Sequence, residues 1–194
     1  MASQPTTDLD QLNRTLQAII PIANGKRKLP PVETWNPEHC ADIGMEIRAD
    51  GSWWHEGTKF SREKLVQLFS TILRKDADGS TYLVTPYEKV IVHVEDAPFL
   101  AVRVDAAESN GEHVIVVTTN LGDFVEIGSD NPLRVETDPE TGEPSPYVLV
   151  RGRLEAKLTR PAFYELVEMA EEVDGELVVR SHGERFSLGR MDAE

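Results

Sequence analysis

The chain has 194 residues, and its 40% hydrophobic content is enough to build one packed domain or two small ones. Its 34 acidic against 20 basic residues give a formal net charge of -14, which repels phosphate backbones and anionic lipid surfaces, so neither duplex nucleic acid nor a membrane is an expected partner. Cys40 is the only cysteine, which excludes an intrachain disulfide, and no apolar run approaches the roughly 18 residues of a membrane span, so we expect a cytoplasmic protein.

Residues 1–30 are predicted to form an amphipathic helix followed by a linker. Apolar side chains recur three or four positions apart in this segment: Leu9, Leu12, Leu16, Ile19 and Ile20. Pro30 and Pro31 then end the linker. The apolar stripe of the helix packs either on the rest of the chain or on a protein partner, and the sequence leaves both alternatives open.

Residues 31–105 are predicted to form a first α+β repeat. Alternating apolar residues at 43–47, a turn at Asp50 and Gly51, and the run Ser52–His55 indicate a hairpin. A helix is expected to begin at Ser61, whose hydroxyl would cap it. Its apolar stripe consists of Leu65, Leu68, Phe69, Ile72 and Leu73. Strands are expected at Tyr82–Thr85 and at 90–94.

Residues 106–194 are predicted to form a second repeat with its connecting strands. The apolar runs Phe99–Val104, Val114–Thr119 and Phe124–Ile127 indicate an antiparallel meander that leads into it. The runs Leu133–Thr137 and Tyr147–Arg151 then flank a loop rich in proline and glycine.

A second helix is expected to follow, capped by Thr159, with Pro161 tolerated in its first turn. Strands around Val178 and Phe186 complete the repeat. Its helix resembles the first one, because the order apolar, hydroxyl, arginine at 60–62 recurs at 158–160. We therefore predict an α+β fold with two duplicated units, each built from mainly antiparallel strands and one packed helix, with a ligand pocket at the interface of the two copies.

Arg62 and Arg160 are candidate binding residues because both are expected in the first turn of a helix. A cation there opposes the helix dipole by a few tenths of a kcal/mol to about 1 kcal/mol, so another group should compensate it. One interpretation is a structural ion pair, for instance with Glu56 or Glu155. The other is an anionic ligand, because helix amides and a guanidinium together suit a phosphate.

A second set of candidate binding residues lies at predicted strand ends: Thr119, Asn120, Asp123, Arg134, Tyr147, Arg151 and Glu155. In this hypothesis arginines hold an anion, Asn120 and Asp123 bind a sugar or base, an aromatic ring stacks, and Glu155 orients an arginine. The alternative is that Asn120 and Asp123 only form a turn. The leading hypothesis is a ligand-sensing module for a small phosphorylated or nucleotide-like molecule.

The sequence supports no catalytic residue, metal site or cofactor. His39 and Cys40 are neighbours on a predicted strand and so point to opposite faces, which does not make a catalytic dyad. The histidines lack zinc-ligand spacing, and no glycine-rich phosphate loop is present. An enzyme is therefore the less favoured class. The alternatives to a ligand-binding module are a protein-interaction scaffold that uses the N-terminal helix and, third, a hydrolase of unknown substrate.

Two groups of residues resemble a known family. The first group is Trp35, Asn36, Pro37, Cys40, Asp42, Ile43, Met45, Ile47, Gly51, Trp53 and Gly57. The second group is Val84, Thr85, Pro86, Glu88, Lys89, Thr141, Gly142, Glu143, Pro144, Pro146, Tyr147, Arg151, Leu154 and Glu155. Together they resemble the bacterial domain-of-unknown-function family 1285. The resemblance implies duplicated α+β units, a C-terminal half loosely similar to pleckstrin-homology folds, a nucleotide-type ligand between the halves, and a role in signal transduction.

Overall fold

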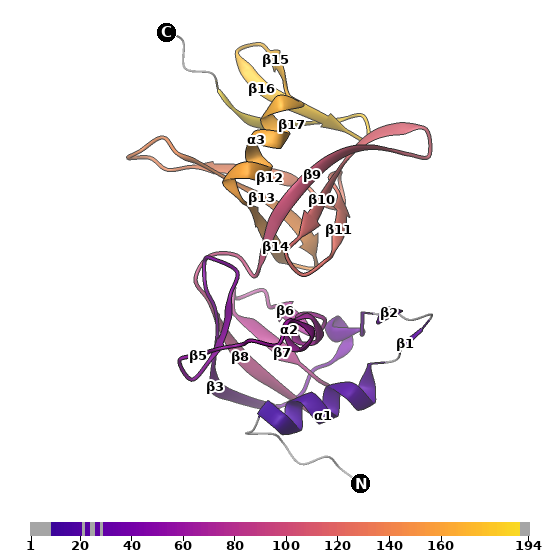
Figure 1. The fold of residues 1–194 in the computed structure, drawn as a ribbon, viewed down its shortest axis with the longest axis vertical. Helices are drawn as coiled ribbons and strands as arrows, with labels where there is room; N and C mark the ends of the chain where they lie inside the picture. Colours follow the sequence, from indigo (N-terminus) through magenta and orange to yellow (C-terminus); the bar gives the residue numbers. More distant parts are fainter. Residues whose placement is uncertain (1–8, 21, 24–25, 28, 191–194) are drawn as a thin grey trace. The chain divides into compact units, whose positions relative to one another are not determined.

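The computed structural model describes residues 9–20, 22–23, 26–27 and 29–190, and the chain divides into two compact units, Met1–Asp96 and Ala97–Glu194 (Figure 1). Each unit contains a six-stranded mixed sheet and a packed helix, which confirms the predicted α+β fold with two duplicated units. The division lies between Asp96 and Ala97, whereas the boundary expected at residue 105 falls within strand β9, Phe99–Ser109.

The first unit consists of a six-stranded mixed sheet, a separate antiparallel pair of the short strands β1 (Ile22–Ala23) and β2 (Lys26–Arg27), two α-helices and one short 3-10 helix. Its elements are α1 (Leu9–Ile19), β1, β2, the short 3-10 helix η1 (Val32–Thr34), β3 (His39–Ile47), β4 (Trp53–His55), β5 (Thr58–Lys59), α2 (Glu63–Ser70), β6 (Leu73–Lys75), β7 (Thr81–Val84) and β8 (Glu88–Val94). The strand order is β5-β4-β3-β8-β7-β6, with β3 and β8 parallel at the centre and the other pairs antiparallel.

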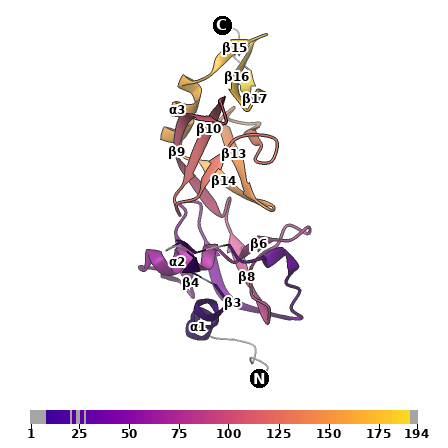
Figure 2. The same ribbon diagram turned by 90° about the vertical axis from the view of Figure 1, so that its right-hand side faces the viewer.

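The core of the first unit lies mainly on one face of this sheet, although strand β7 is buried on both faces. Alternate residues of the two central strands are buried, among them Met45 and Ile47 on β3 and Val90 and Val92 on β8. The helices contribute buried Leu12, Leu16, Leu68 and Phe69. Figures 1 and 2 show α1 and α2 beside the sheet. Apolar burial therefore holds both helices in place.

The second unit consists of two sheets and one helix. Its elements are β9, β10 (Glu112–Thr119), β11 (Phe124–Glu126), β12 (Leu133–Thr137), β13 (Pro144–Arg151), β14 (Leu154–Leu158), α3 (Arg160–Glu168), β15 (Glu171–Val173), β16 (Glu176–Ser181) and β17 (Glu184–Arg190). The larger sheet has the order β11-β10-β9-β14-β13-β12, with β9 and β14 parallel, and the smaller sheet has the order β15-β16-β17. Figure 1 shows α3 along β9.

A buried serine joins the two sheets of the second unit. The hydroxyl of Ser181 donates to the carbonyl oxygen of Ile127 at 2.6 Å and accepts from the amide of Ile115 at 2.9 Å. The amide of the next residue, His182, donates to the carbonyl of His113 at 3.0 Å. Buried polar groups of this kind are costly to leave unpaired, so these bonds hold the β16–β17 turn against the larger sheet.

The two helix starts differ from each other. Thr159 caps α3 as predicted: its hydroxyl accepts from the amide of Ala162 at 3.5 Å, and Pro161 stands in the first turn. The prediction for Ser61 was wrong. The residue at the N-cap of α2 is Arg62, without a side-chain cap bond, and the helix begins at Glu63. Among the residues that the structure describes, no helix is both long and apolar enough to cross a bilayer.

Candidate functional site

The predicted first-turn arginines have different environments. Arg62 belongs to the first unit and lies exposed at the N-cap of α2, and no carboxylate of the described residues forms an ion pair with it. Arg160 is the first residue of α3, and its Nη2 forms an ion pair with Oε1 of Glu143. The carboxylate that faces Arg160 is therefore Glu143 from the β12–β13 loop, and neither of the two glutamates considered from the sequence.

Three predicted residues form the turn between β10 and β11. The Thr119 hydroxyl donates to Oδ2 of Asp123 at 3.2 Å and accepts from the Asp123 amide at 3.0 Å. Asn120 exchanges two hydrogen bonds with the backbone of Leu100, one through its side-chain oxygen at 3.0 Å and one through its own amide at 2.8 Å. These polar groups close the sheet where the β9–β10 register shifts, so they have a structural role.

Arg151 completes this turn cluster, which we define as Thr119, Asn120, Asp123 and Arg151. Its Nη1 donates to Oδ1 of Asp123 at 3.1 Å, and its guanidinium lies 4.9 Å from the centroid of the Phe99 ring. Burial lowers the pKa of Arg151, although the negative charge of Asp123 acts in the opposite direction. The guanidinium is thus largely desolvated and held by protein groups.

The other predicted strand-end residues, Arg134, Tyr147 and Glu155, lie together on β12, β13 and β14. Glu136 and Lys157 lie beside them, and we call these five residues the cation cluster. The strand register places Arg134, Tyr147 and Lys157 in one row. Nε and Nη2 of Arg134 donate to the two carboxylate oxygens of Glu155 at 2.7 and 2.8 Å, and Nη1 donates to Glu136. The hydrogen bonds to Glu155 raise the pKa of Arg134 above its ordinary value, so this guanidinium is permanently charged.

The ring of Tyr147 supports the two cations of this cluster. The Arg134 guanidinium lies 4.4 Å and the Lys157 ammonium 5.6 Å from the ring centroid, both within cation–π range. Tyr147 is only 8% exposed. A ligand base therefore has little access to this ring for stacking.

The turn cluster and the cation cluster lie on opposite faces of the larger sheet. Ala156 is paired with Phe99 on the neighbouring strand, and paired residues share a face. Arg151 lies over Phe99 and so belongs to the face of Ala156. Glu155 and Lys157 flank Ala156 in the sequence and point to the other face. The structure thus separates the strand-end residues into two groups.

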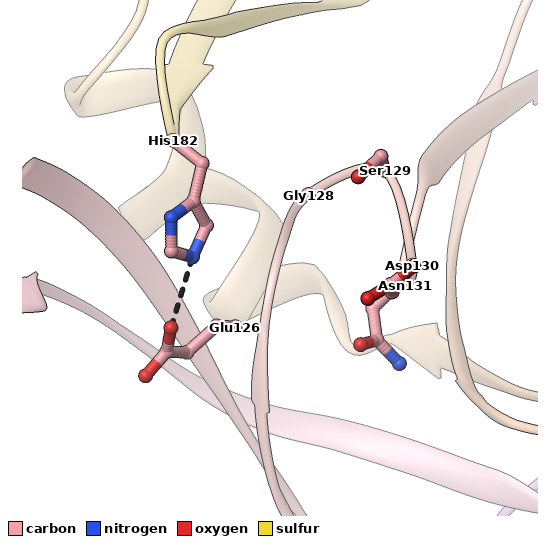
Figure 3. A pocket seen from close by; sticks show the side chains of 6 residues that line it. All are labelled: Glu126, Gly128, Ser129, Asp130, Asn131 and His182. Atoms are coloured by element: carbon pink, nitrogen blue, oxygen red, sulfur yellow. Dashed lines mark hydrogen bonds and ion pairs between the residues drawn. The ribbon is translucent and has the colours of Figure 1, made fainter.

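A pocket that was not predicted from the sequence lies in the second unit, between the β16–β17 turn and the loop that follows β11 (Figure 3). Its volume is about 360 Å³, and six residues line it: Glu126, Gly128, Ser129, Asp130, Asn131 and His182. Figure 3 shows His182 and Glu126 on one side and the Gly128–Asn131 loop on the other.

His182 has a left-handed backbone conformation. Its φ of 52° and the φ of 72° at Gly183 form a left-handed two-residue hairpin turn. Its Nε2 lies 2.9 Å from Oε2 of Glu126, and its Nδ1 lies 3.5 Å from Oε2 of Glu112. The available sequence signal for this turn is the glycine at position 183 between two β-rich runs, because glycine is typical of such turns.

The arrangement of acidic and histidine side chains is not that of a metal centre. Within the described residues, no three side chains of His, Cys, Asp or Glu are grouped so that they could hold a metal ion.

Comparisons with known proteins give a family but no activity. Residues 30–97 match the N-terminal domain and residues 98–188 the C-terminal domain of a family described as a domain of unknown function, DUF1285. A DUF1285 family protein from Silicibacter pomeroyi DSS-3 is 39% identical, with a TM-score of 0.81 and 98% of each chain covered. Another from Shewanella baltica OS155 is 30% identical, with a TM-score of 0.52, 65% of this chain and 91% of that chain covered. No curated protein matches the chain.

Proposed function

The chain belongs to the DUF1285 family, and we propose that it acts as a small-ligand-binding module in signal transduction, whose second unit binds a phosphorylated or nucleotide-like molecule at the cation cluster. The observation that supports this proposal is the state of the Arg134 guanidinium. The Glu155 carboxylate holds it in one orientation, and the exposed part of the guanidinium keeps N–H groups that can donate to a ligand.

The hydrogen bonds of Arg134 can be counted. A guanidinium has five N–H groups, and three of them are engaged, two with Glu155 and one with Glu136. The remaining two N–H groups have no acceptor among the described residues, and the side chain is 43% exposed. A phosphoryl group accepts such pairs of charge-assisted hydrogen bonds well.

The two carboxylates of the cluster have different roles in this proposal. Glu155 is 24% exposed and binds the guanidinium through both oxygens, whereas Glu136 is 64% exposed and binds through one. Exposed single contacts contribute little to stability, so an incoming phosphate displaces Glu136 and leaves Glu155 in place. Lys157 adds a second positive charge in the same row.

The phosphoryl group, rather than the base, supplies the affinity. The Tyr147 ring is covered, so a nucleotide has no open aromatic platform in this cluster. Adenosine is therefore expected to bind far more weakly than AMP. This expectation narrows the nucleotide-like class to ligands whose phosphate is accessible.

Calorimetric titration of the full chain with AMP tests the proposal. The Glu136→Gln variant should bind AMP more tightly, by about twofold to fivefold, because an exposed competing ion pair is worth about 0.4 to 1 kcal/mol, and Arg134→Gln should bind it at least tenfold more weakly.

A matched control is available on the same sheet. Arg103 and Asp105 also form an exposed arginine–carboxylate pair, with Nη2 and Oδ1 2.6 Å apart. Asp105→Asn removes the same charge as Glu136→Gln. Equal effects of these two substitutions on AMP affinity would mean that AMP responds only to net charge and would refute the site.

A further inference from the structure

The pocket of Figure 3 is rich in hydrogen-bond acceptors. Glu126 and Asp130 contribute carboxylates, and neither lysine nor arginine is among the six lining residues. The amide nitrogen of Asn131 donates to the carbonyl oxygens of Leu149 at 2.9 Å and Val150 at 3.1 Å. Both partners can only accept, so the orientation of the amide is set and its oxygen is left as an acceptor.

The wall opposite the loop depends on His182. Asparagine or glycine would suit the left-handed position of this turn better than histidine. Histidine is nevertheless one of the non-glycine residues that adopt this conformation more readily, and at this position its imidazole lies beside Glu126 and Glu112. The imidazole thereby holds the Glu126 carboxylate at the wall of the pocket, as Figure 3 shows.

Gly128 allows the ring and the loop to approach each other closely. A Cβ atom at this position would lie 3.2 Å from Cδ2 of His182, which is tighter than ordinary contacts. The glycine is buried, while Ser129 and Asp130 at the loop tip are exposed. The mouth of the pocket therefore carries the Asp130 carboxylate and the Ser129 hydroxyl, and its wall carries Glu126.

We propose that this pocket binds a small organic molecule with a protonated amino group. The carboxylates of Glu126 and Asp130 and the amide oxygen of Asn131 would accept its N–H groups. A volume of about 360 Å³ lies at the lower end of the range of small-molecule sites and far exceeds a bare metal ion. The site is distinct from the cation cluster in position and in charge, so it stands without the proposed phosphate site.

Backbone amide NMR spectra of the full chain, recorded with putrescine and with 1,4-butanediol, test this proposal. The two probes have the same carbon chain and differ in their ammonium or hydroxyl ends. At about 0.15 M salt, which screens long-range attraction, putrescine should shift the amides of Gly128, Asn131 and Gly183, and butanediol should not. Equal shifts with both probes, or no shift with putrescine, would overturn the proposal.

Two isosteric variants test whether the carboxylates of Glu126 and Asp130 bind the ammonium groups of putrescine. Glu126→Gln and Asp130→Asn should each weaken putrescine binding at least about fivefold, because each removes an ion pair with the ligand. Asp105→Asn, which removes the same charge on strand β9 outside the pocket, should change it less than twofold. Asp130 forms no ion pair among the described residues, so its variant keeps the pocket intact even if Glu126→Gln loosens His182. Equal weakening by all three variants would indicate general attraction to an acidic chain and would overturn the assignment.

Discussion

Arginines with different exposure have different uses in this protein. Arg151 is partly buried beside Asp123 and Phe99, and its charge serves the fold. Arg134 is oriented by Glu155 and remains half exposed, which is the state that suits an anion. Arg160, which is exposed beside Glu143, forms a surface ion pair of small energetic value. Residue type alone therefore does not distinguish these three arginines, and the choice of Arg134 for the proposed site rests on its exposure and on its two N–H groups without an acceptor among the described residues.

Asp42 gives a prediction at the scale of one residue. Its Oδ1 accepts from the amide of Gly44 at 2.9 Å, and its Oδ2 lies 3.0 Å from Nε2 of His93. The Gly44 bond is the larger cause and the His93 bond the next, and together they lower the pKa of Asp42. A carboxyl with a lowered folded-state pKa stabilises the fold at neutral pH, and this contribution is lost as the pH falls through that pKa.

Carbon-detected NMR titration of the Asp42 carboxyl group measures this effect directly. Its midpoint should lie below that of an ordinary aspartate, and His93→Ala should raise the midpoint without fully restoring it, because the Gly44 amide remains. Asp42→Asn should make the free energy of unfolding less dependent on acid pH. An ordinary midpoint in the unaltered chain would show that the Gly44 and His93 contacts do not persist in solution.

Single elements differ in how well the sequence predicts them. The amphipathic stripe of α1, the meander β9–β11 and the Thr159 cap were all correctly predicted, because each follows from local periodicity or capping. The first packed helix was predicted too long: it ends at Ser70, and the buried Leu73 belongs to β6. Strands of two or three residues are too short to show alternation.

The helix caps provide a matched pair of substitutions. Thr159→Ala should lower the free energy of unfolding by about 0.5 to 1 kcal/mol, toward the low end because the cap bond is 3.5 Å long. Ser61→Ala should change it by less than about 0.5 kcal/mol, because Ser61 does not cap α2. Denaturant unfolding of both variants, with Thr159→Ser as the conservative control, measures the difference. A loss at Ser61 equal to that at Thr159 would contradict the observed start of α2.

The grouping of the predicted binding residues depends on contacts that a single sequence does not reveal. The chain order of the strands does not show that β14 lies between β9 and β13. That arrangement places Glu155 beside Arg134 and separates it from Arg151 by the thickness of the sheet. The role suggested for Glu155, to orient an arginine, agrees with its contacts to Arg134. The pocket beside His182 was not predicted, because it arises from the packing of segments that are far apart in the sequence.

In the whole molecule, the six-stranded sheets of the two units have the same topology. When the six strands of each sheet are numbered in chain order, both sheets have the spatial order 3-2-1-6-5-4. The packed helix joins the third and fourth strands in the first unit and follows the sixth strand in the second.

The net charge of -14 acts on all ligands alike. General attraction therefore favours cations, and any binding of an anion must come from a local group such as the Arg134 guanidinium.

Side-chain NMR of the Arg134 guanidinium in the full chain, titrated with AMP and with adenosine, tests the central claim most directly. The Arg134 resonance can be assigned by its loss in Arg134→Lys. We predict that AMP at millimolar concentration shifts this resonance and that adenosine leaves it unchanged, because the phosphate alone reaches the two remaining N–H groups. An Arg134 resonance that does not respond to AMP, or that responds equally to adenosine, would contradict the proposed ligand site.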